Sequence, residues 1–310
     1  MREKSCIIDH ISAMKPLPLF DNQDEILNSK TFVAEVKYDG ERYLSLFEGR
    51  NCVRYFSLHK NRVSGLNVEK TDRFPHINKI KHEIKGTVLD GEIHSKTLED
   101  TCAITGSLPE RAIKLQGKIG YVKYKVFDCL FYCGRDIRHK PYFHRRKYAK
   151  MVVEELDNDY ISLSKANIQH KQKLLDNVRR IGGEGIVLKD ISSTYEPGTR
   201  HKKWYKIKNE IKVDVVITDY VMGKGKHNKD KIGAIVYSAY ENEKLERWGT
   251  VGGMTKAIIE EITNHPEEYL GTVIEIESQG YTKNMNLRHP RFSRFRLDKK
   301  PSECLKIKQT

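Results

Sequence analysis

Residues 32–42 read Phe32-Val-Ala-Glu35-Val-Lys37-Tyr-Asp39-Gly40-Glu-Arg42, and this is the most informative segment of the chain. Side chains alternate between the two faces of a β-strand, so Glu35, Lys37 and Asp39 are expected on one face and apolar residues on the other. A lysine between two carboxylates, followed by a glycine that lets the backbone approach a ligand closely, indicates a binding site. Taken alone, the stretch also fits an exposed edge strand with its charges toward solvent.

Four later segments carry charged or aromatic side chains in similar settings. They are Val-Leu-Asp90-Gly-Glu92-Ile, Val-Phe127-Asp, Gly-Gly-Glu184-Gly-Ile-Val-Leu-Lys189 and Trp204-Tyr-Lys206-Ile-Lys208. Strand alternation places Asp90 with Glu92 on one face, and Glu184 stands between glycines at the start of a strand. Each segment alone is a weak signal, but together they predict one shared pocket.

The order of expected elements divides the 310 residues into two domains. Residues 1–208 mix strand-like runs (31–38, 87–93, 120–127 and 185–189) with helical stretches (145–156 and 167–181), which is an α+β pattern. Residues 209–310 carry β-branched alternating runs (213–220, 233–239 and 271–278) with one expected helix over 255–263. This second pattern is typical of an OB-fold, and other small β-barrels would read similarly.

The net charge of +14 favours an anionic polymer as partner, and nucleic acid rather than a membrane surface. Residues 1–208 hold 39 Lys and Arg against 27 Asp and Glu, whereas residues 209–310 hold 17 against 15. The first domain therefore carries nearly all of the surplus. Charge alone also fits a well-solvated surface without such a partner.

In this order and spacing, the five segments resemble the nucleotidyltransferase motifs of ATP-dependent DNA ligases. The resemblance extends to Leu287-Arg-His-Pro-Arg-Phe-Ser-Arg294-Phe-Arg296-Leu-Asp298-Lys299, which is similar to the last motif of that family. It implies an adenylyltransferase domain of ATP-grasp-like antiparallel sheets with helices over residues 1–208, followed by an OB-fold domain over residues 209–310. It also implies a ligase that seals 3′-hydroxyl/5′-phosphate nicks in duplex DNA through a lysyl-AMP and a DNA-adenylate.

The resemblance implies a role for each matching residue. Lys37 would be the nucleophile, with Asp39, Lys206 and Lys208 completing the catalytic group. For ATP, Glu35 would contact the adenine amino group and Phe127 the adenine face. Arg42 would contact a phosphate, Glu92 the ribose or metal, and Lys206 and Lys208 the α-phosphate. The departing pyrophosphate would be held by Arg294, Arg296, Asp298 and Lys299. Glu92 and Glu184 would bind Mg²⁺ or Mn²⁺. A lysine amine has a reference pKa of about 10.4, so the nucleophile must lose its proton before it can attack.

One motif departs from the family pattern, because Phe56-Ser57-Leu58-His59-Lys60-Asn61-Arg62 lacks the usual Ser-Arg pair. Lys60 and Arg62 both remain candidates for the missing phosphate contact. Other expected DNA contacts are Arg42, Lys202 and Lys203 and the loop lysines Lys224 and Lys226, for which a plain solvated loop is the alternative. Contacts of this kind would be salt-dependent and blind to sequence.

Three alternatives stay open: an mRNA capping guanylyltransferase, an RNA ligase and a catalytically silent DNA-binding module. Tyr38 after the lysine and Glu35 before it are ligase-like. The six cysteines are dispersed, which favours free thiols over a zinc site. No apolar run approaches the roughly 20 residues that cross a bilayer, and no secretory signal is visible. We therefore expect an intracellular monomer that binds no membrane.

Overall fold

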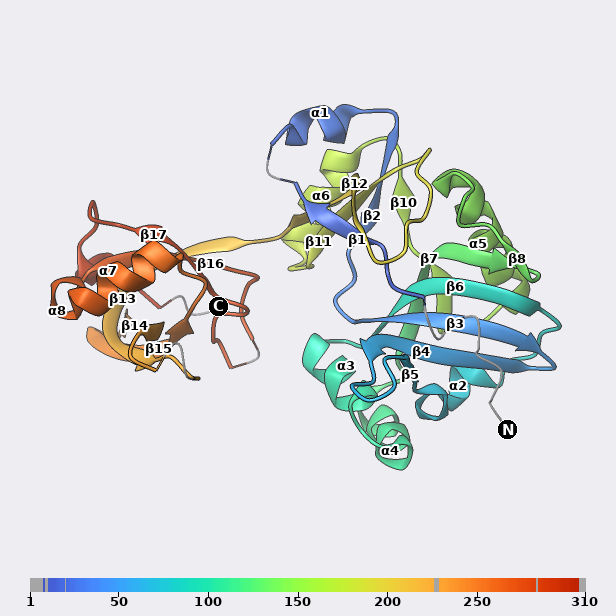
Figure 1. Ribbon diagram of the computed structural model, residues 1–310, viewed down its shortest axis with the longest axis horizontal. Helices are drawn as coiled ribbons and strands as arrows, with labels where there is room; N and C mark the ends of the chain where they lie inside the picture. The colour runs from blue at the N-terminus through green and yellow to red at the C-terminus, as the bar shows by residue number, and fades with distance from the viewer. Residues whose placement is uncertain (1–7, 9–10, 20, 226–228, 283, 307–310) are drawn as a thin grey trace. The chain divides into compact units, whose positions relative to one another are not determined.

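The computed structural model describes residues 8, 11–19, 21–225, 229–282 and 284–306 (Figure 1). The chain divides into two compact units, unit 1 (Met1–Ile207) and unit 2 (Lys208–Thr310). The division falls one residue before the boundary expected from the sequence. Within the described residues, no helix is both long and apolar enough to span a membrane.

Unit 1 contains two sheets. The first has the order β1-β12-β11-β2-β10, formed by β1 (Lys15–Pro18), β12 (Arg200–Lys208), β11 (Gly185–Asp190), β2 (Phe32–Val36) and β10 (Ala166–Asn167). The second has the order β5-β4-β3-β6-β7-β8, formed by β5 (Asn67–Glu69), β4 (Cys52–Lys60), β3 (Glu41–Gly49), β6 (Lys85–His94), β7 (Lys123–Tyr132) and β8 (Arg135–Asp136), with β9 (Ile161–Leu163) parallel to β7. Strands β2 and β3 follow each other in the chain but belong to different sheets, so the turn between them joins the two sheets.

The helices of unit 1 pack against these sheets. They are α1 (Gln23–Asn28), α2 (Pro75–Asn78), α3 (Leu98–Thr105), α4 (Pro109–Ile119), α5 (Tyr142–Leu156) and α6 (Lys171–Arg180), with a 3₁₀ turn at Thr71–Arg73. Helix α5 lies along β7, and α6 packs on β11 and β2 (Figure 1). Thr97 caps α3 by accepting a hydrogen bond from the Asp100 amide, and Pro109 occupies the first turn of α4, where no amide donor is needed.

Aromatic side chains form the centre of the largest core of unit 1. Tyr43, Tyr55, Phe74 and Tyr124 are all fully buried, and their rings meet edge to face at centroid distances of 5.3 to 5.9 Å. Such edge-to-face pairs add to the free energy of burial because the positive ring edge meets the negative ring face. This core holds strands β3, β4, β6 and β7 in a fixed arrangement, and three of these strands contribute residues to the site described below.

Unit 2 is built on one antiparallel sheet with the order β15-β14-β13-β16-β17. Its strands are β13 (Ile211–Met222), β14 (Ile232–Glu241), β15 (Lys244–Val251), β16 (Val273–Ser278) and β17 (Arg291–Phe295), and its helices are α7 (Lys256–Asn264), α8 (Pro266–Tyr269) and a 3₁₀ turn at Pro301–Glu303. An isolated bridge pairs Gly252, which follows β15, with Arg291 at the start of β17. The two edge strands of the sheet are therefore linked at this point.

Most of the expected elements differ from the observed bounds by a few residues at their ends, including one strand and one helix near the cavity described below. The strand expected over residues 31–38 ends at Val36, so alternation does not extend to Lys37 and Asp39. The helix expected over residues 167–181 begins only at Lys171, because Ala166–Asn167 pair with β2 and His170 has a φ of 55°. Local helix propensity was overridden in the second case by strand pairing that the sequence pattern does not reveal.

A buried ion pair anchors α5 to β7. Arg145 and Asp128 are both 0% exposed, and the guanidinium donates two hydrogen bonds to the carboxylate at 2.8 and 2.9 Å. Asp128→Ala should lower the free energy of unfolding by about 3–5 kcal/mol, because it leaves a buried guanidinium without its counter-charge. Chemical denaturation measures this loss. Asp136→Ala removes the carboxylate from the exposed Arg138 pair and should cost less than about 1 kcal/mol; equal losses would contradict the prediction.

Candidate active site

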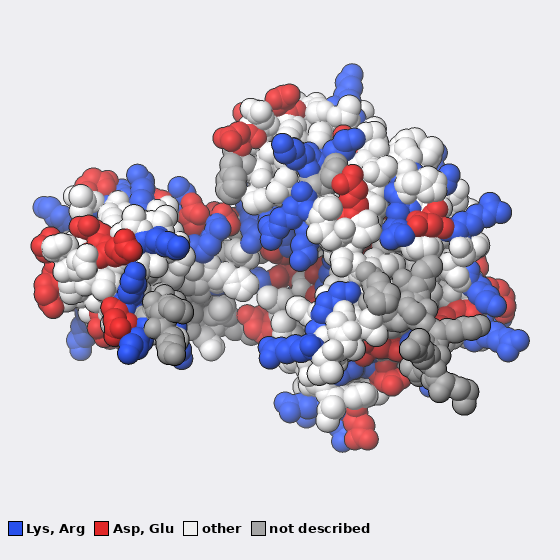
Figure 2. Space-filling view, viewed as in Figure 1, with Lys and Arg blue, Asp and Glu red and all other residues white. Residues whose placement is uncertain are grey.

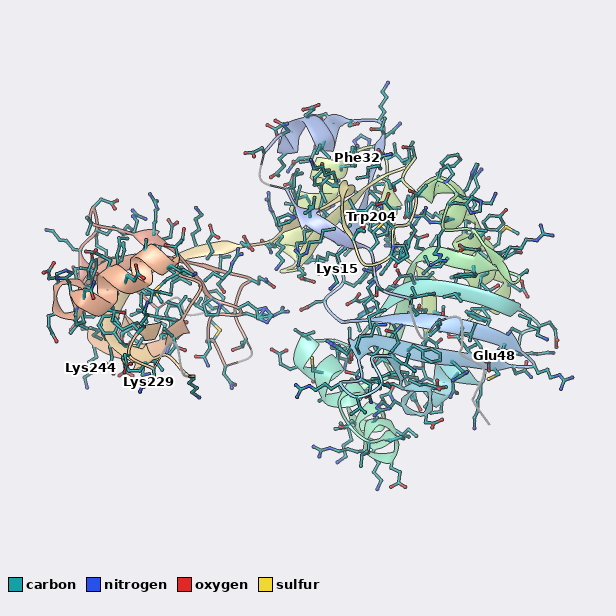
Figure 3. All side chains as sticks on the ribbon, in the orientation of Figure 1. Lys15, Phe32, Glu48, Trp204, Lys229 and Lys244 are labelled. Atoms are coloured by element: carbon teal, nitrogen blue, oxygen red, sulfur yellow. The ribbon has the colours of Figure 1, made fainter. Side chains whose placement is uncertain are left out.

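A cavity of about 250 Å³ in unit 1 brings together residues from both sheets. Its lining residues are Pro16, Glu35, Val36, Lys37, Tyr38, Arg42, Glu92, Phe127, Val187, Lys189 and Trp204. Five of the residues expected to form a site are present: Glu35, Lys37, Arg42, Glu92 and Phe127. The indole of Trp204, labelled in Figure 3, is 1% exposed and belongs to β12. Val36 and Tyr38 also line the cavity, so the wall is not the single charged strand face that alternation predicts.

The turn between β2 and β3 passes directly against β6. A Cβ atom on Gly40 would lie 2.2 Å from the carbonyl oxygen of Ile93, so only glycine fits at this position. On the other side, the amide of Lys37 donates to the carbonyl of Gly185 at 2.9 Å, and Gly185 has a φ of 138°. These two glycines let the backbone segment that carries Lys37 lie between β6 and β11.

Lys37 is held by Glu184, the residue that precedes β11. Its Nζ atom lies 2.6 Å from Oε2 of Glu184, and the two side chains are 25% and 10% exposed. The amine is therefore at the cavity wall, in reach of a ligand and paired with a carboxylate. A lysine so placed can act as a nucleophile only after this pair separates and the amine loses its proton.

Arg42 is fixed by a two-contact pair with Asp90. Its Nε and Nη2 atoms donate to the carboxylate at 2.8 and 2.5 Å, and Nη1 donates to the carbonyl of Met14 at 2.7 Å. Asp90 is fully buried and also accepts from the hydroxyl of Tyr195 at 2.8 Å. The guanidinium carbon stands 5.0 Å from the ring centroid of Phe127. A cation is thereby placed beside an aromatic face at the cavity.

Glu35 is buried at 2% exposure and surrounded by donors. Its carboxylate accepts hydrogen bonds from Tyr142 and, at 2.6 Å, from Ser164. Two cations also contact it, Lys189 at 3.2 Å and Arg146 at 3.4 Å. This buried carboxylate is therefore surrounded by cations and hydrogen-bond donors that compensate for the loss of water.

The carboxyl group of Glu92 has a pKa well above its ordinary value. Burial is the largest cause, and the carboxylates of Glu184 and Asp90 add to it, so the pKa of Glu92 rises to about 8 although Lys37 and Arg42 oppose the rise. A carboxyl group with too little positive charge around it favours a proton or another cation. Among the described residues, no group of three or more His, Cys, Asp or Glu side chains is arranged to hold a metal ion.

Glu92→Gln should make the protein more stable in alkaline solution. Because the folded-state pKa of Glu92 is raised, its favourable contribution is complete below about pH 4.5 and is lost as pH rises through about 8. Glutamine cannot ionise, so the variant should gain at least about 1 kcal/mol over the parent at pH 9 and little at pH 5. Thermal melting in EDTA from pH 5 to 9 measures this difference. A constant difference across that range would contradict the prediction.

The four residues predicted from the last motif cluster within unit 2. They are Arg294, Arg296, Asp298 and Lys299. Asp214 lies 3.2 Å from Arg296 and 2.6 Å from Lys299, and Glu275 contacts Arg294 and Arg296 at 3.2 and 3.6 Å. Hydrogen bonds from Arg296 lower the pKa of Asp298 to about 2. Asp214 on β13 is thus the counter-charge for two residues of this motif.

The other predicted residues lie outside the cavity lining. Asp39 lies in the turn before β3, and Lys206 and Lys208 lie on β12 at half-buried positions beyond Trp204, with Lys208 assigned to unit 2. Five of the residues predicted to contact DNA are exposed, namely Lys60, Arg62, Lys202, Lys203 and Lys224, whereas Arg42, which was also predicted to contact DNA, is half-buried at the cavity. Lys60 also lines a second cavity of about 430 Å³ together with Lys15, Arg42 and His59. Lys226 lies outside the described residues.

Lys and Arg side chains gather on the visible face of unit 1 over the region of β1 and β11 (Figure 2). Sequence reasoning gave no role to Lys189, nor to Tyr142, Arg146 and Ser164, which surround Glu35. For Lys189, the one visible signal in the sequence was that this charged residue ends the apolar run Ile186-Val-Leu188. No spacing in the sequence indicates the other three.

The two sheets are mostly antiparallel, and a lysine stands at the wall of the cavity between them, with a carboxylate, an arginine and an aromatic ring around it. This arrangement is a mixed α/β fold of the nucleotidyltransferase type. Residues 19–208 match the family model described as ATP dependent DNA ligase domain. This match covers more than half of the chain, and the chain therefore belongs to the ATP-dependent DNA ligase family.

Relatives and solved structures agree with this assignment. The DNA ligase of vaccinia virus (strain Ankara) is 31% identical over 259 residues, which cover 78% of this chain and 46% of the viral protein. The chain thus spans about half the length of the curated viral relatives it matches. A structure named Pmar-Lig_PreS3 matches with a TM-score of 0.69 at 21% identity, covering 92% of this chain and 68% of that one. A Lig E DNA ligase structure matches with a TM-score of 0.66 at 20% identity, covering 92% and 100%. These two structures share the fold.

Proposed function

We propose that this chain is an ATP-dependent DNA ligase that seals nicks in duplex DNA through an AMP adduct on Lys37. The observation that carries the proposal is the contact between Lys37 and Glu184 at the wall of a cavity that Arg42, Glu92 and Phe127 also line. The cavity offers an aromatic face for a base, a buried carboxylate for an amino group and an amine for a phosphate. These are the groups that ATP would need.

Three transfers would follow one another at this site. The neutral amine of Lys37 attacks the α-phosphorus of ATP, an N–P bond forms, and the bond to pyrophosphate breaks. An oxygen of the DNA 5′-phosphate then attacks the same phosphorus, which releases the lysine and leaves a DNA-adenylate. Finally the 3′-hydroxyl attacks the 5′-phosphate, loses its proton, and expels AMP. Such transfers depend on alignment and charge neutralisation more than on covalent help.

Glu92 and Glu184 would hold Mg²⁺ or Mn²⁺ together with the nucleotide phosphates. Two carboxylates and phosphate oxygens are the ligands that Mg²⁺ uses in nucleotide sites. The raised pKa of Glu92 fits this role, because Lys37 and Arg42 do not fully offset the burial of the carboxyl group. When bound, the metal would neutralise charge on the phosphates. Lys206 and Lys208 are proposed to contact the α-phosphate, and Asp39 to complete the catalytic group.

Residues 1–208 would be the adenylyltransferase domain and residues 209–310 an OB-fold domain. The elements of unit 2 follow the order three strands, two helices and two strands, and this order supports an OB-fold. The bridge from Gly252 to Arg291, which links the sheet edges, supports it as well. Arg294, Arg296, Asp298 and Lys299 would orient the pyrophosphate. Arg296 and Lys299 must exchange Asp214 for phosphate oxygens when they do so.

Nicked duplex DNA would be the partner, bound through its backbone and without sequence preference. The exposed basic residues Lys60, Arg62, Lys202, Lys203 and Lys224 support this, and Arg42 would contact the nick from the cavity. One chain supplies every group named above, which supports action as a monomer. An intracellular site of action is supported by the use of ATP. It is also supported by the five cysteines that the structure describes, all of which are free thiols.

Self-labelling of the purified chain tests the proposal. The protein is incubated with Mg²⁺ and α-labelled ATP or GTP, separated on a denaturing gel, and in parallel supplied with nicked DNA or nicked RNA. A label from ATP that disappears as nicked DNA is joined is the expected result. A label from GTP alone would instead identify a capping-type enzyme, and discharge only on RNA would identify an RNA ligase.

A further inference from the structure

Lys189 occupies a cage of aromatic rings at the cavity. It belongs to β11, and its side chain is 3% exposed. Its Nζ atom lies 4.5 Å from the ring centroids of Phe127 and Trp204 and 4.7 Å from that of Tyr142. Cation–π contacts strengthen when the cation is desolvated, and three rings here replace the water that an ammonium normally binds.

The ammonium touches two groups that are proposed to recognise the base. It lies 3.2 Å from Oε1 of Glu35 and donates to the carbonyl oxygen of Phe127 at 3.3 Å. One buried charge therefore fixes both the carboxylate and the backbone of the aromatic residue. A buried ammonium of this kind costs several kcal/mol in desolvation unless it is paired. Its retention at the wall of a cavity is consistent with a role there.

The two oxygens of Glu35 are used differently. Oε1 accepts from Tyr142 and is also contacted by Lys189 and Arg146, which saturates its two lone pairs. For Oε2 the recorded donor is the hydroxyl of Ser164 at 2.6 Å. An ionised carboxylate oxygen accepts two hydrogen bonds, so Oε2 can take one more donor and cannot itself donate.

We propose that Lys189 is a specificity-determining positioning residue, which orients Glu35 so that the cavity selects a purine with an exocyclic amino donor over one with a carbonyl. This inference rests on the proposed function, in which the cavity binds ATP. Without the ammonium, Oε1 of Glu35 loses one of its contacts and the carboxylate is no longer held in one orientation. Oε2 would then meet an exocyclic amino group in a less favourable position, so a base such as hypoxanthine, which carries a carbonyl there, would be disfavoured less strongly.

The test compares self-labelling by α-labelled ATP and inosine triphosphate, which carries a carbonyl in place of the amino group. Lys189→Met, which keeps the length of the side chain, should raise KM for ATP with a smaller change in the maximal rate. It should lower the ATP/inosine triphosphate ratio of kcat/KM by at least about 10-fold, the usual size of a lost discriminating hydrogen bond. Lys189→Arg should keep the ratio within about 3-fold, because the charge is retained.

Lys171→Met is the matched control, because Lys171 is also 3% exposed but caps backbone carbonyls of Ser29 and Ile168 away from the cavity. Its ATP/inosine triphosphate ratio of kcat/KM should equal that of the parent. If Lys189→Met does not fold, Glu35→Gln provides the same test, because its amide can donate to a carbonyl and should shift the ratio toward inosine triphosphate. A folded Lys189→Met, or Glu35→Gln, with the parental ratio overturns the inference while the ligase proposal stands. A parent chain that takes no label from either nucleotide overturns the proposed function and this inference with it.

Discussion

Replacing Lys37 with alanine should reduce nick sealing by at least about 10⁴-fold, because removal of a covalent nucleophile leaves no route to the intermediate. The structure gives this residue its position through the backbone bond to Gly185 and the 2.6 Å contact with Glu184. Sealing of a 5′-labelled nicked duplex, measured in the presence of Mg²⁺ and ATP, gives the rate. Lys37→Arg should be equally inactive, because a guanidinium stays protonated.

The Lys37→Ala variant should still join a nick that already carries AMP on its 5′-phosphate. That last transfer uses the 3′-hydroxyl as nucleophile and needs no lysyl adduct. Lys150→Ala, at an exposed position on α5, serves as the control for loss of a lysine and should seal at the parental rate. Nick sealing by Lys37→Ala within about 10-fold of the parent would contradict the proposed covalent mechanism.

Glu184→Gln should lower the rate of self-labelling by about 10²–10³-fold, equivalent to about 2.7–4 kcal/mol in activation free energy. Glu184 is the carboxylate that holds the Lys37 amine, and it is also one of two proposed metal ligands, so the substitution weakens both alignment and charge neutralisation. Single-turnover labelling over a range of Mg²⁺ concentrations measures the effect. The variant should need more Mg²⁺ for its half-maximal rate.

Glu154→Gln is the matched control, because Glu154 is 64% exposed and pairs only with Lys150 on the surface of α5. Its labelling rate and Mg²⁺ requirement should match those of the parent. A Glu184→Gln variant with a parental rate at every Mg²⁺ concentration would show that this carboxylate is not part of the chemistry.

The sequence predicted the residues of the cavity better than the way they are arranged. Glu35, Lys37, Arg42, Glu92 and Phe127 all line the cavity, and each was named by the resemblance of its short motif to a ligase motif. The predicted alternation nevertheless stops at Val36, where the backbone leaves the strand to pass β6.

Contacts between distant segments could not be read from local patterns. Arg42 was expected to face a phosphate, but in the structure it is held by Asp90 and the carbonyl of Met14. The donors around Glu35 come from α5, β11 and the segment after β9, more than a hundred residues away in the chain. Their meeting depends on how the sheets pack, and no spacing within one segment encodes that.

In unit 2, too, contacts between distant segments could not be predicted from local sequence patterns. The last motif was visible as a run of basic residues, but its counter-charges Asp214 and Glu275 lie on β13 and β16. These strands pair through Asp214 and Glu275 themselves, so the register of the sheet brings both carboxylates to one place. A periodic pattern predicts that such strands exist, whereas their register depends on packing across the whole sheet.

Locating the nucleotide on the chain tests the central claim most directly. The protein is incubated with ATP and Mg²⁺, digested, and its peptides are sequenced by mass spectrometry before and after addition of nicked DNA. We predict AMP on the peptide that contains Lys37, bound to that lysine and lost when nicked DNA is added. AMP on another lysine such as Lys206, or no AMP on any peptide while nicks are still sealed, would contradict the account.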